Sequence, residues 1–176
     1  MKRIILAGFG LVVALGVAVH AARAQYVLYY HVFDEWTVIC ALDEPTARTR
    51  CELRAPVPDL GSATDAVRFE VIEPPAGDTA VLLHVNQAVD AARGLSLVVD
   101  GNAPHRTLLT RTGDAGWRGA EAAAILGEMA GGTTVTVRFV RWGDGAVSER
   151  RFALTGFPAA RQTYLQRSSA AGAAPR

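Results

Sequence analysis

Apolar and polar residues alternate in short stretches from Trp36 to Leu154, and this pattern predicts a series of β-strands. Segment 36–40 is rich in aromatic and β-branched residues, and segment 50–54 alternates charged and apolar positions. The residues between them, 42–48, have the composition of a turn. These two strands are therefore expected to form a hairpin or to lie close together.

The same alternation predicts three further strands, at 67–71, 80–85 and 95–99. Asp100-Gly101 is a tight-turn dipeptide, so segment 105–110 is expected to pair back on 95–99.

The clearest hairpin joins 133–142 to 146–154 through Gly143-Asp144-Gly145, because glycine adopts the positive φ angles of such a loop. Arg138 is expected to face outward on its first strand and to pair with Glu149 on its second.

Helical signals are confined to the alanine-rich segment 119–129 and to a segment that begins after Phe157, with Pro158 at its first position. Many short strands and few helices predict an all-β fold, an antiparallel β-sandwich with one short internal helix and a short C-terminal helix.

The first 24 residues resemble a secretory signal peptide, with a basic start, an apolar run at 4–19 and a final Ala22-Arg23-Ala24. That run is shorter than the roughly 20 residues that span a bilayer, which favours cleavage over an uncleaved anchor. Gln25 follows, where a lipoprotein would have a cysteine. We therefore expect one domain at 25–167, a disordered tail at 168–176, and no transmembrane span after cleavage.

Cleavage would remove three of the 18 basic residues and none of the 17 acidic ones, so the formal net charge would fall from +1 to −2. Nucleic-acid binding needs a basic excess, so this charge disfavours a nucleic-acid partner. The expected location is the periplasm, with outer-membrane association or secretion as alternatives.

Cys40 and Cys51 are the only cysteines, and an exported protein meets an oxidising compartment. A disulfide between them would close a loop of about 12 residues and contribute about 3 kcal/mol. A catalytic pair would have the closer C-x-x-C spacing.

No arrangement of residues predicts an active site. His31 with Asp34 would bind a metal only if His84 or His105 converged on it, and solvated polar residues are the simpler interpretation. Ser96, His105 and Asp100 supply the residue types of a hydrolase triad, but no strained turn surrounds the serine. We assign no catalytic residue, no metal and no cofactor.

Two loops are the candidate binding elements. The first, 111–118, contributes Arg111, Asp114, Trp117 and Arg118, and its tryptophan is either an exposed anchor or a side chain packed on the core. The second is the hairpin tip 143–145. Arg118, Arg141 and Arg150 form either a basic patch or a solvated face.

Four segments together resemble the invasion-associated locus B family of exported bacterial proteins. They are Asp34-Glu35-Trp36-Thr37-Val38-Ile39-Cys40, Arg50-Cys51-Glu52-Leu53, the strand 94–101 (GLSLVVDG) and the close 152–157 (FALTGF). The resemblance covers roughly 33–166. It departs from the family at 111–117, where Thr112 and Trp117 stand in place of a second cysteine pair.

The resemblance implies a non-enzymatic periplasmic or surface-associated β-sandwich. Family members are linked to entry into host cells but also occur in bacteria that invade nothing, so a general envelope role is expected. The partner would be an unknown protein or envelope component. The alternatives are a periplasmic metal-dependent hydrolase and a carrier of a small ligand or lipid.

Overall fold

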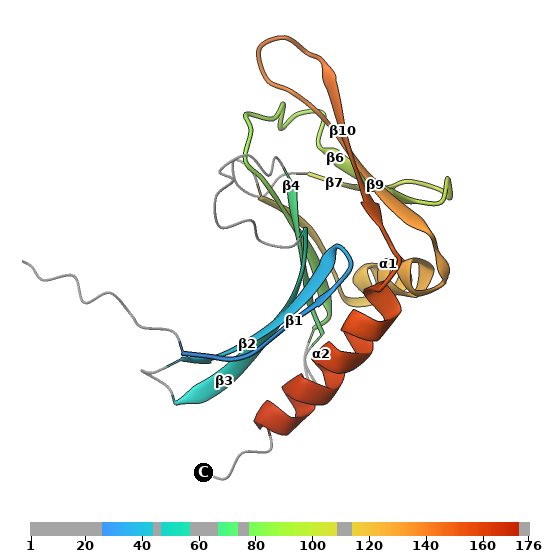
Figure 1. Ribbon diagram of the computed structural model, residues 1–176. Helices are drawn as coiled ribbons and strands as arrows, with labels where there is room; N and C mark the ends of the chain where they lie inside the picture. The colour runs from blue at the N-terminus through green and yellow to red at the C-terminus, as the bar shows by residue number, and fades with distance from the viewer. Residues whose placement is uncertain (1–25, 44–46, 57–66, 74–77, 109–113, 173–176) are drawn as a thin grey trace, which may run out of the picture.

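The computed structural model describes residues 26–43, 47–56, 67–73, 78–108 and 114–172 (Figure 1). Strands and helices in this part of the chain form two antiparallel sheets and two helices. The six-stranded sheet has the order β1 (Tyr26–Phe33), β2 (Trp36–Asp43), β3 (Arg48–Ala55), β4 (Val67–Ile72), β5 (Ala80–Val85), β8 (Asp114–Arg118). The four-stranded sheet has the order β10 (Val147–Ala153), β9 (Thr134–Val140), β6 (Leu95–Val99), β7 (His105–Thr107).

One face of the six-stranded sheet is covered by the four-stranded sheet and by α2 (Phe157–Gly172) (Figure 1). Aromatic rings join the three parts. Trp36 of β2 packs edge-to-face on Phe69 of β4 and on Phe157 of α2, and Phe69 in turn packs on Phe152 of β10. All four rings are fully buried, so the predicted sandwich with its two helices is confirmed.

The internal helix α1 (Gly119–Gly131) lies where the alanine-rich segment predicted it. Its buried side chains are spaced three and four residues apart, which places them on one face: Ala122, Ile125, Leu126, Met129.

Helix α2 is hydrogen-bonded to Glu73, the residue that follows β4 of the six-stranded sheet. Tyr164 is buried and its hydroxyl accepts the backbone N–H of Glu73 at 3.0 Å. Arg161 donates two hydrogen bonds to the Glu73 carboxylate, and these raise the pKa of its guanidinium. The helix continues to Gly172, five residues past the domain boundary predicted at 167, because alanines favour helix. The disordered tail predicted at 168–176 is therefore wrong for residues 168–172. Residues 173–176 lie outside the described part.

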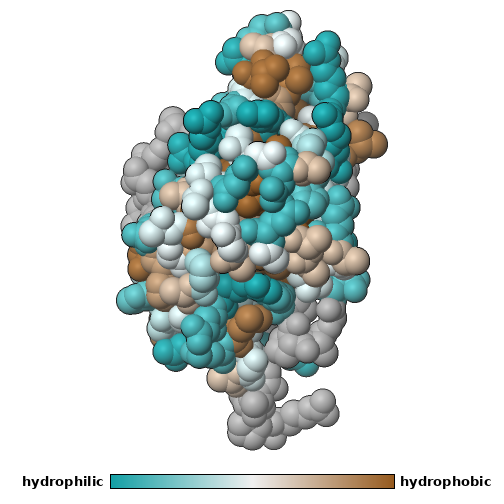
Figure 2. Space-filling model, turned by 90° about the vertical axis from the view of Figure 1, so that its right-hand side faces the viewer, coloured by the Kyte–Doolittle hydropathy of each residue, from teal (hydrophilic) through white to brown (hydrophobic). Residues whose placement is uncertain are grey.

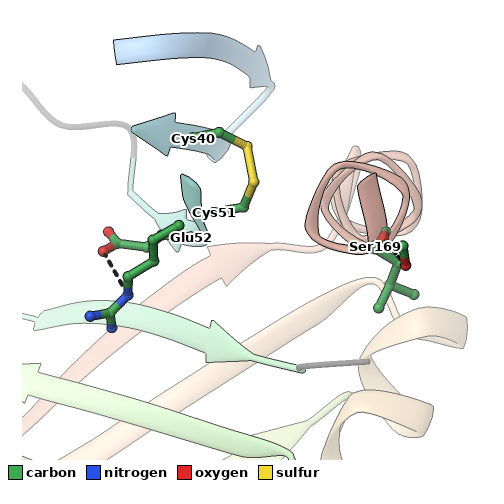
Figure 3. The surroundings of a disulfide bond; sticks show 6 residues. Cys40, Cys51, Glu52 and Ser169 are labelled. Carbon is green, nitrogen blue, oxygen red and sulfur yellow. Dashed lines mark hydrogen bonds and ion pairs between the residues drawn. A yellow bond between two sulfur atoms is a disulfide. The ribbon is translucent and has the colours of Figure 1, made fainter. Parts of the chain in front are cut away.

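Cys40 and Cys51 are directly opposite each other on β2 and β3, which form the predicted hairpin pair, and a disulfide joins them. Figure 3 shows the bond on the side of these strands that faces α2, whereas Glu52 points to the other side. The second predicted hairpin is also present: Arg138 lies opposite Glu149, and the two form an ion pair at 2.6 Å.

Two strands were not predicted. β1 was interpreted as solvated residues before the first strand, but its backbone pairs with β2 along almost its whole length. β8 was interpreted as part of a loop, but it pairs with β5 at the edge of the six-stranded sheet. Among the described helices, neither is long and apolar enough to cross a bilayer.

Candidate functional site

The three histidines in the described part of the chain lie apart, each against different neighbours. His31 packs its ring on Phe33 within β1. His84 contacts Asp114 at 2.7 Å, and His105 contacts Glu128 at 3.0 Å. Across the described ranges, histidine, cysteine and acidic side chains nowhere form a group of three or more that would hold a metal.

The three residues that supply the residue types of a hydrolase triad also point apart. Ser96 and Leu97 are neighbours on β6, and His105 lies opposite Leu97, so Ser96 and His105 face opposite sides of the sheet. The Asp100 carboxylate accepts the backbone N–H groups of Thr133 and Thr134 and the hydroxyl of Thr133, all at 2.8 Å. These bonds hold the pKa of Asp100 below its usual range.

The structure corrects the exposed-anchor interpretation of Trp117. The residue lies opposite Val81 on the inward face of β8, and its side chain is 2% exposed, so it belongs to the core. Its neighbour Gly116 indicated a loop, but a Cβ there would come within 2.7 Å of Leu82 Cδ2. This glycine therefore allows close packing within a strand.

The other residues of the predicted loop are separated. Asp114 bonds His84 on the outward face of the sheet, and Arg118 is exposed at the start of α1. Both line a cleft of about 470 Å³ beside β8. Arg111 lies outside the described residues.

The predicted patch of Arg118, Arg141 and Arg150 is distributed over two sheets. Arg141 pairs with Asp144 at the hairpin tip at 2.6 Å, and Arg150 lies over the ring of Phe152. Arg118 belongs to β8 in the other sheet.

A different set of arginines gathers on the outer face of the four-stranded sheet. The strand order places β6 between β7 and β9, so Ser96 lies opposite Arg106 on one side and opposite Arg138 on the other. Their strand neighbours Leu95, Leu97, Val137 and Phe139 are buried, so the polar row points outward.

Arg93, from the turn before β6, completes a groove of about 360 Å³ over this row. We call it the arginine groove and define it by Arg93, Ser96, Arg106 and Arg138. Its three guanidinium groups come from three separate segments, and a serine hydroxyl lies between two of them. Arginine forks and a hydroxyl are donors that suit a phosphate or a carboxylate.

The arginines of the groove differ in how they are neutralised. Arg93 contacts Asp90 at 3.5 Å, and Arg138 shares Glu149 with Arg151. Hydrogen bonds from Arg138 and Arg151 hold the pKa of Glu149 below its usual range. Arg106 has no carboxylate partner within the described part of the chain. As far as the described residues extend, it is the groove cation that is available to a ligand.

Exposed apolar side chains surround the groove. Leu108 and Val147 line it with 68% and 69% of their surfaces exposed, and Val140 lies beside them. Trp142, at the end of the same β9–β10 hairpin, is 70% exposed. At the top of Figure 2, which is the hairpin end of Figure 1, hydrophobic atoms are visible among hydrophilic ones.

The family model described as Invasion associated locus B (IalB) protein matches this chain over residues 36–164. The chain belongs to the IalB family. A similar fold is seen in the crystal structure of invasion associated protein B from Bartonella henselae, at a TM-score of 0.64 and 14% identity. The alignment covers 80% of this chain and 99% of that one. The comparison with curated proteins gives no match.

In this IalB-family chain, two of the segments that carry the resemblance meet in space. The Glu35 carboxylate accepts the backbone N–H of Ala153 at 3.0 Å, and Trp36 Nε1 donates to the carbonyl of the same residue at 2.8 Å. Trp36 also packs on Phe157. We call this contact the motif joint and define it by Glu35, Trp36, Ala153, Gly156 and Phe157. The joint is structural, and none of its residues lines the arginine groove.

Proposed function

We propose that this protein is exported and acts in the cell envelope by binding rather than by catalysis. Its binding site is the arginine groove, and its ligand is an anionic group carried by an envelope component or a host surface. The observation that carries the proposal is the convergence of Arg93, Arg106 and Arg138 around Ser96, with Arg106 lacking a carboxylate partner among the described residues.

The export part of this proposal rests on the sequence of the first 24 residues and on the disulfide between Cys40 and Cys51. The intact mass of the protein from fractionated native cells tests it, with and without reductant. We expect a chain that begins at Gln25 and gains about two daltons on reduction of one disulfide. A full-length chain with two free thiols in the cytoplasmic fraction would refute export.

The groove is tested with inorganic pyrophosphate as a probe. We expect its titration into isotope-labelled mature protein to move the backbone amide signals of Ser96, Arg106 and Arg138 more than those of the six-stranded sheet. Arg106→Gln should abolish the effect. Arg68→Gln is the matched control, since Arg68 is an exposed strand arginine on β4.

Equal responses from both sheets would mean diffuse charge attraction and would contradict the site. The absence of any response at millimolar probe would contradict it as well.

A further inference from the structure

We infer that the arginine groove and Trp142 together form a membrane-binding surface that recognises anionic lipid headgroups. The inference rests on the proposed function, because it names the anion that the same groove binds. It also explains a feature that an anion site alone does not need, namely the exposed apolar side chains beside the arginines.

The charge of this surface is the first argument. Its arginines are Arg93, Arg106, Arg138, Arg141 and Arg151, and its carboxylates are Asp90, Asp144 and Glu149. Five bases and three acids leave two positive charges in excess, although the chain that would begin at Gln25 has a net charge of −2. A basic surface on an acidic protein orients the molecule toward an anionic bilayer.

The apolar side chains are the second argument. Among the described residues, the exposed large hydrophobic side chains fall in two places: five lie in β1, and the other three are Leu108, Trp142 and Val147. Tryptophan beside arginine is the combination that suits the headgroup region, where an amphipathic ring and a cation are both stabilised. Val147 lies opposite Val140 on the hairpin, and both line the groove with Leu108. Trp142 lies two residues after the end of β9 in the same hairpin.

The charge distinguishes this surface from the other exposed apolar one. β1 presents Tyr26, Leu28 and Tyr30 to solvent, but the strand Tyr26–Phe33 contains no arginine or lysine. A cation lies beside it, Arg167 of α2, which stands over the Tyr29 ring at 4.1 Å, whereas the groove collects three arginines. Loss of binding to anionic vesicles on substitution of a groove arginine is therefore the property that assigns binding to the groove.

Tryptophan fluorescence gives a direct test, because the chain has three tryptophans and only Trp142 is exposed; Trp36 and Trp117 are buried. Mature protein is titrated with vesicles of phosphatidylglycerol and phosphatidylcholine, and with vesicles of phosphatidylcholine alone. We expect the emission to shift to shorter wavelength with the first vesicles and to stay unchanged with the second. Trp142→Phe should abolish the spectral shift while co-sedimentation with the vesicles remains detectable.

Charge variants then identify the cation. Each arginine near an anionic surface strengthens binding about fivefold, so Arg106→Gln should weaken the vesicle affinity about fivefold and Arg68→Gln should leave it unchanged. Glu149→Gln should act in the opposite direction, because it removes the carboxylate shared by Arg138 and Arg151. We expect this variant to bind about fivefold more tightly. The gain should be confined to anionic vesicles, because apolar surface exposed by misfolding would increase binding to neutral vesicles as well.

The outcomes separate the inference from the proposed function. Pyrophosphate shifts at the groove without any vesicle binding would overturn the membrane surface and leave the anion site in place. Equal binding to neutral vesicles would overturn it too, since the arginines would then contribute nothing. An equal loss in Arg106→Gln and Arg68→Gln would show attraction by overall charge and would refute both.

Discussion

The motif joint and the arginine groove differ in how their polar groups are used. In the joint, the Trp36 N–H and the Glu35 carboxylate each bond the backbone of Ala153, and the rings around them are fully buried. In the groove, Arg106 is exposed and has no carboxylate partner within the described ranges. A polar group that is hydrogen-bonded to the backbone beside a buried ring stabilises the fold, whereas an unneutralised surface cation costs the fold little and is available to a ligand. The segments that identify the family therefore build the scaffold, and the binding chemistry lies elsewhere.

The largest expected effect comes from truncating one tryptophan in each region, which tests whether the joint carries stability and the groove does not. Trp36→Ala should reduce the free energy of unfolding by about 3–5 kcal/mol, because it leaves a cavity between β2, β4 and α2. Trp142→Ala, its matched control, should change that free energy by no more than about 0.5 kcal/mol, since the side chain is exposed. Denaturant titration of both variants measures the difference. Similar losses in the two would mean that the hairpin end is part of the core.

The disulfide belongs with the scaffold, and its removal is the next largest effect. Cys40→Ala with Cys51→Ala should lower the free energy of unfolding by about 3 kcal/mol, the chain-entropy value for a loop of this length. Pyrophosphate binding by the folded variant should be unchanged, because the groove lies on the other sheet. Loss of groove binding at a temperature where the variant remains folded would show that the two sheets are coupled.

Alternation and turn signals predicted most of the scaffold but not the groove. Strands β2 to β6 and the β9–β10 hairpin follow period-two patterns, and a local turn explains the pairing of β6 with β7. β1 was missed because YVLYYHVF is apolar almost throughout and lies next to the expected cleavage site. β8 was missed because Gly116 indicates a turn when its close contact with Leu82 is unknown. The groove depends on β9 pairing with β6, a long-range contact that no local pattern specifies.

A glycine pair tests whether the motif joint is held by backbone geometry as well as by rings. Gly156 has a φ of +81°, and a Cβ there would lie 2.6 Å from the carbonyl oxygen of Phe33. Gly156→Ala should therefore destabilise the protein by more than about 1 kcal/mol. Gly127→Ala, at an exposed position of α1 with open space around it, should stabilise by about 0.5–1 kcal/mol. Thermal denaturation compares the two, and a neutral Gly156→Ala would mean that the joint tolerates movement of β1.

Acid should weaken the four-stranded sheet through Asp100, which links the end of β6 to the start of β9. The pKa of this carboxyl is lowered by its bonds to Thr133 and Thr134, so its contribution to stability is complete above the ordinary carboxyl pKa of about 4. The contribution is lost as the pH falls through the lowered value, when the carboxylate takes up a proton. Asp100→Asn should melt at a lower temperature than the natural chain at neutral pH, and the difference should shrink as the pH falls below about 4. A difference that is the same at every pH would assign the effect to the shape of the turn.

The smallest expected change in stability is that of Arg106→Gln, and it tests whether binding by the groove is independent of the stability of the scaffold. Arg106→Gln removes an exposed cation with no carboxylate partner among the described residues, so the free energy of unfolding should stay within about 0.5 kcal/mol of the natural value. Arg161→Gln removes an equal charge, but it breaks two hydrogen bonds to Glu73 at the α2 contact and should cost about 1 kcal/mol. The effects on binding should be the reverse of the effects on stability. Arg106→Gln should lose affinity for anionic vesicles, and Arg161→Gln should keep it. If Arg161→Gln also lost vesicle binding, the scaffold and the groove would no longer be separable, because a bond at the far end of the core would then control the surface cation.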